Sequence, residues 1–110
     1  MMNSNDLIIL YVAFANSTSG KRRPVLIIQN SENNVLFFRI TSKFATKSKY
    51  FQSKYYRIRE WKSAGLKKVS YIDTSEVIEF SLGKIQKIYK IGELSTGDIK
   101  GLNEFIKKGS

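Results

Sequence analysis

Apolar residues in the first forty positions come in short continuous runs, which polar segments separate. The runs cover residues 7–15, 25–28 and 35–40, and the polar segments cover residues 16–24 and 30–34. Runs of this length, bounded by Ser, Asn, Gly and Pro, predict three β-strands in a meander. Because apolar and polar positions alternate little within the runs, we expect at least one strand to be buried on both faces of a strongly curved sheet.

The patterning is weaker between residues 41 and 94. Residues 41–54 are rich in Ser, Thr and Lys without clear periodicity, which predicts a long loop with room for a helical turn. A second helical turn is expected within residues 60–66, ended by Gly65. Short apolar or alternating runs predict further strands at residues 55–59, 69–72, 77–80 and 85–91.

The clearest helix lies at the C-terminal end of the chain. Ser95 is suited to be its N-cap, and Asp98 falls at the third helical position, where its charge complements the helix dipole. Two lysines and Gly109 suit its C-terminal end. One face of the helix carries Ile99, Leu102, Phe105 and Ile106. These elements predict one mainly β domain over residues 1–110, a small curved antiparallel sheet or SH3-like half-barrel with a C-terminal helix.

Composition excludes most familiar catalytic machinery. The 110 residues include no Cys and no His, which rules out disulfides, a thiol nucleophile, zinc ribbons, Ser-His triads and His-ligated metals. We therefore expect no metal and no cofactor. The apolar run at residues 7–15 is about half as long as a membrane-spanning helix and has no basic residue before it, so we expect a cytoplasmic protein.

Positive charge is concentrated in the middle of the chain. The formal net charge is +10, and residues 39–68 contain ten Lys or Arg against one Glu, interleaved with six aromatic residues. Cations interleaved with rings that can stack suit a polyanion with exposed bases, so single-stranded nucleic acid is the first hypothesis. The alternative is a solvated face whose aromatic residues belong to the core. A membrane surface fits less well, because the rings do not form one helical stripe.

Four segments of the chain, in order, resemble the PemK/MazF family of toxins from bacterial toxin–antitoxin modules. The first is Ser-Gly-Lys-Arg-Arg-Pro followed by an apolar strand at residues 19–30, and the second is Ile-Thr-Ser at residues 40–42. Residues 56–71 are similar to a Gram-positive branch of PemK-like toxins, and Lys-Ile-Gly-Glu-Leu-Ser at residues 90–95 enters the last helix as in the family. The resemblance covers roughly residues 7–108.

This resemblance implies a homodimeric toxin that cleaves single-stranded mRNA independently of the ribosome and is inhibited by an acidic antitoxin protein. It also implies products with a 2′,3′-cyclic phosphate and a 5′-hydroxyl. Such cleavage needs neither metal nor protein nucleophile, because the attacking 2′-hydroxyl is already adjacent to the phosphorus. A chain without His or Cys is able to catalyse it.

The resemblance and the basic, aromatic-rich residues 39–68 together indicate the site residues. Arg23 is the expected catalytic residue that stabilises the charge developing on phosphate, and the Thr41 hydroxyl is the second. Substrate binding is expected from Ser19, Gly20, Lys21, Arg22, Ser42, Lys43, Lys47, Lys49, Lys54 and Trp61. Trp61, Tyr55 and Tyr56 are equally candidates for the core.

Two positions depart from the family pattern. An acid and an Arg are expected after the later strand; Glu79 is a possible acid/base there, but the Arg is missing, so the general base is unassigned. The opening Asn5-Asp6 replaces the usual Gly-Asp. Two alternatives stay open, a non-catalytic module that binds single-stranded nucleic acid and a toxin-like fold directed at a protein such as a topoisomerase.

Overall fold

Strands make up most of the secondary structure in the computed structural model, which describes residues 3–12, 21–81, 83 and 85–109. The elements in chain order are β1 (Asp6–Val12), β2 (Lys21–Asn30), β3 (Asn34–Thr41), α1 (Lys49–Ser53), β4 (Tyr55–Arg57), β5 (Tyr71–Ser81), β6 (Ile85–Glu93) and α2 (Thr96–Gly109). The mainly β class is confirmed. Neither helix of the described part is long and apolar enough to cross a membrane.

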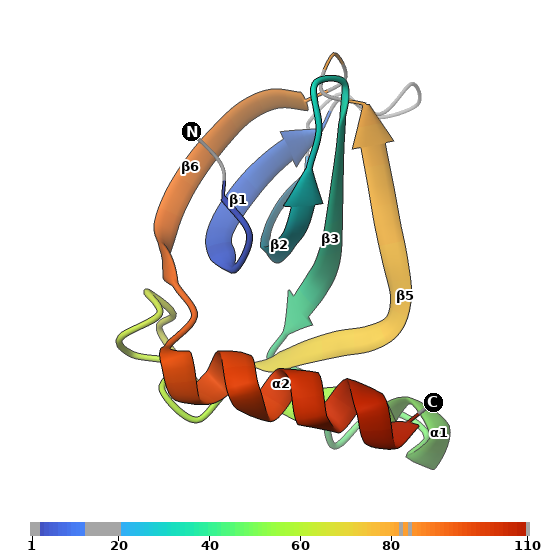
Figure 1. Cartoon of the computed structure of the whole chain (residues 1–110). Coiled ribbons are helices and arrows are strands. Elements are labelled where there is room, and N and C mark those ends of the chain that lie inside the picture. The colour runs from blue at the N-terminus through green and yellow to red at the C-terminus, as the bar shows by residue number, and fades with distance from the viewer. Residues whose placement is uncertain (1–2, 13–20, 82, 84, 110) are drawn as a thin grey trace.

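The six strands form one antiparallel sheet in the order β4-β5-β3-β2-β1-β6. The predicted meander of the first three strands is therefore its centre. β5 adds to one side of the meander beside β3, and β6 adds to the other side beside β1. Figure 1 shows that the strands curve strongly and that α2 lies across one end of the sheet. This arrangement confirms the curved sheet with a C-terminal helix.

The central strands are buried on both faces, as the continuous apolar runs predict. In β3, Phe38 and Ile40 belong to a core cluster with Leu26, and this cluster continues to Leu102 of α2. Val35 and Phe37, at the alternate positions, join a second cluster. Its other buried members are Ile8, Val25 and Ile27. The strand alternation therefore supplies two cores, one on each side of the curved sheet.

Several predicted boundaries are wrong. β2 begins at Lys21, so the basic triplet and Pro24 lie in a strand that pairs with β1 and not in a loop. The runs at residues 69–72 and 77–80 are parts of one strand, β5, which carries a large register shift opposite Phe37 and Arg39. The strand expected at residues 55–59 ends at Arg57. Residues 13–15 of the first predicted strand lie outside the described residues.

The start of α2 confirms the predicted cap and adds a second role for Asp98. The Ser95 Oγ accepts from the Asp98 backbone N–H at 3.1 Å. The buried Asp98 carboxylate accepts from the Tyr56 hydroxyl at 2.7 Å and from the backbone N–H groups of Arg59 and Glu60 at 3.0 and 2.9 Å. One carboxylate thus ties the helix to residues 56–60.

The packing face of α2 differs from the prediction at one position. Leu102 is buried, and Ile99 and Phe105 pack against the same core cluster. Ile106 is instead 39% exposed. The apolar stripe of α2 therefore extends beyond the part of the helix that the sheet covers.

Two glycines allow residues 64–65 to touch β6. Gly65 has φ of 94°, and a Cβ there would meet the backbone carbonyl of Ile91. A Cβ on Gly92 would meet the carbonyl of Ala64 in the same way. The predicted helical turn at residues 60–66 is a series of turns in the structure. The Ala64 N–H donates to the Glu60 carbonyl as in a helix, and the left-handed Gly65 ends this turn, with the Gly65 and Leu66 N–H groups donating to the Lys62 and Trp61 carbonyls.

The structure also explains the departure at the start of β1. Asn5 has φ of 71°, in the left-handed region that Gly adopts freely and Asn tolerates best among other residues. Its backbone N–H donates to Ile27 and its carbonyl accepts from Leu94, so the turn joins β2 to the end of β6. Asn5 is therefore a conformational substitute for the glycine of the family pattern.

Candidate functional site

Thr41 is the last residue of β3, opposite Tyr71 of β5. Its side chain is half-buried, and its Oγ1 accepts from the backbone N–H of Lys43 at 3.1 Å. This bond holds the turn that follows the strand, while the hydroxyl keeps its own proton for another acceptor. A hydroxyl in this position is able to donate to a phosphate oxygen.

Arg23 and Thr41 lie on neighbouring strands of the sheet. The pairing of β2 with β3 ends at Val25 and Arg39. Arg23 precedes Val25 by two residues and Thr41 follows Arg39 by two, so both lie beyond the same end of the pairing. Each Cα therefore lies at most about 7 Å along its strand from the pair. Arg23 is also paired with Leu10 of β1, so its backbone is part of the sheet. The fold brings the two predicted catalytic positions to one region.

The other predicted residues before Arg23 divide into two groups. Lys21 and Arg22 continue β2 and pair with Val12 and Tyr11 of β1. Ser19 and Gly20 lie outside the described residues. All three residues of the basic triplet, Lys21, Arg22 and Arg23, therefore lie in β2.

The loop after Thr41 is anchored by an aromatic stack. The Phe44 ring lies parallel to the Tyr71 ring, with centroids 4.6 Å apart and 12° between the planes. The Gln52 Nε2 donates to the carbonyls of Phe44 and Lys47 at 3.0 and 3.1 Å, which joins the loop to α1. Exposed on this anchored loop and helix are the predicted substrate-binding residues Ser42, Lys43, Lys47 and Lys49.

Lys54 and Trp61, also predicted to bind substrate, have contacts within the protein. The Lys54 Nζ donates to the Gly109 carbonyl at 3.4 Å and lies 6.0 Å from the Tyr50 ring centroid. Trp61 is half-buried against the core cluster, with the Lys62 Nζ 5.5 Å from its ring centroid. Base stacking by Trp61 stays a prediction, and its packing is that of a core residue.

Tyr55 and Tyr56, the other candidate stacking residues, are buried at 8% and 7% exposure. Burial, together with the hydrogen bond to Asp98, raises the pKa of Tyr56 above its ordinary value. Burial, with a contribution from the Asp73 charge, also raises the pKa of Tyr55. Both rings are parts of the core, which is the second of the two readings that the sequence allowed.

An ion pair that sequence reasoning missed lies beside Thr41. Arg39 precedes Thr41 by two residues in β3, so both side chains leave the same face of the strand. Its Nη2 lies 3.3 Å from the Glu76 Oε1, and both side chains are more than half exposed. Such an exposed pair is worth at most about 1 kcal/mol, so an anion is able to replace Glu76. The register shift that brings Glu76 to Arg39 has no signal in the sequence.

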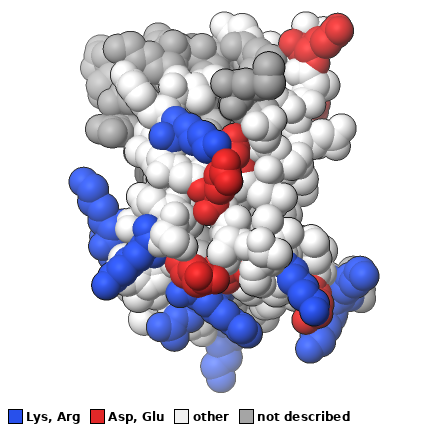
Figure 2. Space-filling model, turned by 60° about the vertical axis from the view of Figure 1, so that its left-hand side comes forward, with Lys and Arg blue, Asp and Glu red and all other residues white. Residues whose placement is uncertain are grey.

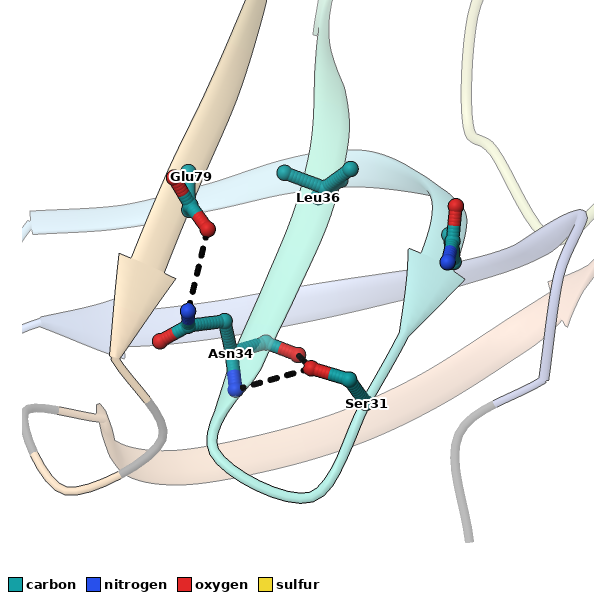
Figure 3. Close-up of a pocket in the computed structure, with 5 residues that line it drawn as sticks. Ser31, Asn34, Leu36 and Glu79 are labelled. Atoms are coloured by element: carbon teal, nitrogen blue, oxygen red, sulfur yellow. Dashed lines mark hydrogen bonds between the residues drawn. The ribbon is translucent and has the colours of Figure 1, made fainter.

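Glu79, the predicted acid/base, lies elsewhere on the sheet. It is opposite Leu36, five residues before Thr41 in β3, which corresponds to about 17 Å. Its Oε2 accepts from the Asn34 Nδ2 at 3.0 Å, and Figure 3 shows the two side chains directed toward each other near the β2–β3 hairpin. A small open pocket there is lined by Gln29, Ser31, Asn34, Leu36 and Glu79. Within one chain, the structure does not bring Glu79 together with Thr41.

The basic side chains are unevenly distributed over the surface. Figure 2 shows one face on which most Lys and Arg side chains lie in the lower half, the level at which α2 crosses the end of the sheet in Figure 1. Among the described residues, no three potential Asp, Glu, Cys or His ligands come together as a metal site. The exposed lysines on the loop and helix after Thr41 are suited to anions.

The comparisons with known proteins concern the family and the fold. A family model described as PemK-like, MazF-like toxin of type II toxin-antitoxin system matches residues 7–109. The solved structure of Mycobacterium tuberculosis toxin MazF-mt6 is similar with a TM-score of 0.62 and 19% identity, over 91% of this chain and 92% of that chain. An endoribonuclease in complex with its cognate antitoxin, from a mycobacterial species, is similar with a TM-score of 0.61 and 12% identity, over 96% of this chain and 90% of that chain. No curated protein matches. At these identities the structural matches show a shared fold.

Proposed function

Because this chain belongs to the PemK/MazF family of toxins of type II toxin–antitoxin systems, we propose that it is an endoribonuclease that cleaves single-stranded mRNA and so inhibits translation. The observation that carries the proposal is the position of Arg23 and Thr41, two residues beyond the last β2–β3 pair and next to a loop of exposed lysines. The cleavage is independent of the ribosome and of metal ions.

The proposed reaction is internal attack by the RNA. The 2′-hydroxyl oxygen forms a bond to the adjacent phosphorus and loses its proton, the bond from phosphorus to the 5′-oxygen breaks, and that oxygen takes up a proton. The products are a 2′,3′-cyclic phosphate and a 5′-hydroxyl. The intramolecular attack already supplies proximity, so the protein must fix in-line geometry and stabilise charge. Arg23 binds the phosphate oxygens with its guanidinium, and Thr41 donates a hydrogen bond.

Arg39 supplies a second guanidinium in place of the Arg that the family pattern has and that is missing from residues 73–79. Its side chain shares a strand face with Thr41 and, among the described residues, makes an exposed bond to Glu76. When Arg39 turns to the phosphate, the Glu76 carboxylate is released beside the reacting groups and is a proton acceptor for the 2′-hydroxyl. The geometry favours Glu76 over Glu79 for this role, because Glu79 lies about 17 Å from Thr41 along the sheet.

Substrate binding is proposed for the residues around this centre. Ser42, Lys43, Lys47 and Lys49 hold the RNA backbone from the anchored loop, because they are exposed and a polyanion gains from each cation it meets. The segment before Arg23 contributes Ser19, Gly20, Lys21 and Arg22.

The proposed partners follow from the family as well. An acidic antitoxin would cover the basic surface, and the similar mycobacterial endoribonuclease is in complex with its own antitoxin. We propose a homodimer in the cytoplasm. The edge position of β6 and its Ile88, which is 39% exposed, are consistent with a surface that a second copy covers.

The test is cleavage of unstructured RNA by the purified protein in the presence of EDTA. We expect cutting of the RNA, no cutting of DNA of the same sequence, and a 2′,3′-cyclic phosphate on the upstream product. RNA with a 2′-deoxy group at the scissile nucleotide must stay intact, and its cleavage would exclude internal attack. Salt-dependent binding without any product would instead support the non-catalytic module.

A further inference from the structure

The short helix α1 presents two aromatic rings to solvent. Tyr50 is 62% exposed and Phe51 is 42% exposed. Their ring centroids are 5.3 Å apart with 78° between the planes, an edge-to-face pair. None of the five residues of α1, all of them described, is buried. The two rings therefore contribute little to the core, and their exposure needs another explanation.

The surrounding contacts hold this exposed helix in place. Ser48 caps α1, with its Oγ accepting from the Phe51 backbone N–H. The Gln52 bonds to Phe44 and Lys47 fix the helix to the loop that begins at Thr41. Rings held in this way lose little conformational freedom when they bind a ligand. The arrangement is typical of a binding surface that is formed in advance.

Positive charge surrounds the two rings. The Lys54 Nζ lies between the Tyr50 ring and the Gly109 carbonyl, so α1 is adjacent to the C-terminal end of α2, as Figure 1 also shows. Residues 43–54 and 100–109 together contain seven lysines and a single acid, Glu104. All of these lysines except the half-buried Lys54 are exposed.

The combination of exposed rings and lysines distinguishes between two kinds of charged partner, an acidic peptide and single-stranded RNA. An acidic peptide would use the lysines, and its apolar side chains would pack on leucine as well as on the rings, so it does not require the ring faces. Every unpaired base has a π-face that stacks on such rings, while the adjoining phosphates pair with lysines. The surface therefore matches single-stranded RNA better than it matches a peptide.

We propose that Tyr50 and Phe51 form a stacking platform for unpaired bases that flank the scissile nucleotide, with Lys47, Lys49 and Lys54 near the phosphates. The proposal rests on the proposed endoribonuclease function and deepens it. The loop from Thr41 through Phe44 to Gln52 joins the platform to the proposed reaction centre. RNA that enters this centre continues over α1.

The test measures binding and not cleavage. An unstructured RNA with 2′-O-methyl groups throughout is not cleaved by internal attack, and fluorescence anisotropy reports its affinity. We expect Tyr50→Leu/Phe51→Leu to lower the affinity about 10-fold, because leucine keeps an apolar surface but removes the stacking faces. The single variant Phe51→Trp keeps or raises the affinity.

The matched control is Val77→Ala, which alters a 52% exposed apolar side chain on β5 and leaves the affinity unchanged. Circular dichroism checks that the leucine variant is folded. An unchanged RNA affinity in this variant overturns the platform, whatever happens to binding of an acidic peptide.

A second measurement separates the platform from the chemistry. The double variant Lys47→Gln/Lys49→Gln should reduce the slope of log affinity against log salt by about 1.4, the contribution of two phosphate contacts to a single strand. An unchanged slope would show that Lys47 and Lys49 do not contact RNA phosphates. A wild-type protein that binds in this assay but never cleaves natural RNA contradicts the proposed function and leaves the platform standing.

Discussion

Residues 41–54 and residues 56–70 carry the same net charge of +4, and both contain aromatic residues, yet the fold uses them in opposite ways. In the first segment, Tyr50 and Phe51 are exposed. In the second segment, Tyr56 is 7% exposed, and Ile58 and Ala64 are completely buried. The second segment docks on α2 and β6, whereas the first is anchored through Phe44, Gln52 and the Lys54 carbonyl, which accepts from Thr74.

The difference comes from the partners that tertiary structure supplies. Asp98 accepts two backbone N–H groups and one hydroxyl from the second segment, and glycine at residues 65 and 92 allows backbone to touch backbone. No comparable carboxylate contact reaches the first segment among the described residues. Apart from the half-buried Lys54, the cations of both segments are exposed, so the two segments differ in the exposure of their rings. Charge density alone therefore does not identify a nucleic-acid surface.

The largest expected effect is on the docking of the second segment. Gly65→Ala should destabilise the protein by about 4 kcal/mol, because a Cβ would overlap the Ile91 carbonyl and the backbone is left-handed. Urea unfolding followed by circular dichroism measures the change. Gly97→Ala is the control, since its Cβ would lie 3.7 Å from the Glu60 Oε1 in ordinary contact. Equal unfolding midpoints for the two variants would contradict the close backbone packing.

The next largest effect is on catalysis at the proposed reaction centre, which contains Arg23 and Thr41. Arg23→Ala should lower kcat about 10²- to 10³-fold with the fold intact, because a positive group aimed at the developing phosphate charge is lost. Arg59→Ala is the matched control, because the structure uses the Arg59 backbone N–H for docking and leaves its side chain exposed. Single-turnover cleavage of RNA compares the two variants, and equal rates would remove Arg23 from the site.

The third effect depends on pH. Burial disfavours the charged form of Asp98, but hydrogen bonds from Tyr56, Arg59, Glu60 and Ser95 outweigh it and hold its pKa below the ordinary 3.8. Its contribution is therefore fully present above pH 3.8 and is lost as the pH falls through the lowered value.

We therefore expect Asp98→Asn to lower the free energy of unfolding by about 2 kcal/mol at neutral pH. The difference in this free energy between the variant and the unchanged protein, the gap, should narrow below about pH 4. Urea unfolding at a series of pH values measures the gap. Glu104→Gln, on the exposed side of α2, should follow the unchanged protein throughout. A gap that is constant down to low pH would show that ionisation of Asp98 does not stabilise the docking.

The smallest effect compares one lysine from each segment. Lys43→Gln should reduce the salt slope of RNA binding by about 0.7, the value for one phosphate contact with a single strand. Lys68→Gln should leave the slope unchanged if the second segment serves docking. Equal reductions would show that both segments contact the RNA, which would contradict the assignment of residues 56–70 to docking alone.

The local sequence pattern was sufficient to predict the structure where residues close together in the chain decide it. The central meander follows from apolar runs, since Val35, Phe37, Phe38 and Ile40 are all buried in the two cores. The cap of α2 follows from Ser95 and Asp98, three residues apart. The candidates Arg23 and Thr41 came from motifs, and the sheet places both positions beyond the same strand pair.

Long-range pairing decided the rest. Glu76 reaches Arg39 only because β5 shifts its register opposite β3, and no neighbouring residue encodes that shift. Tyr50 and Tyr56 are the same residue type six positions apart in a basic stretch, but only Tyr56 meets the Asp98 carboxylate. The sequence by itself determined the strands, the terminal helix and the excess of positive charge, because these depend on composition and short periodicity. Which rings face solvent was decided by the tertiary structure, because burial depends on contacts between residues far apart in the chain.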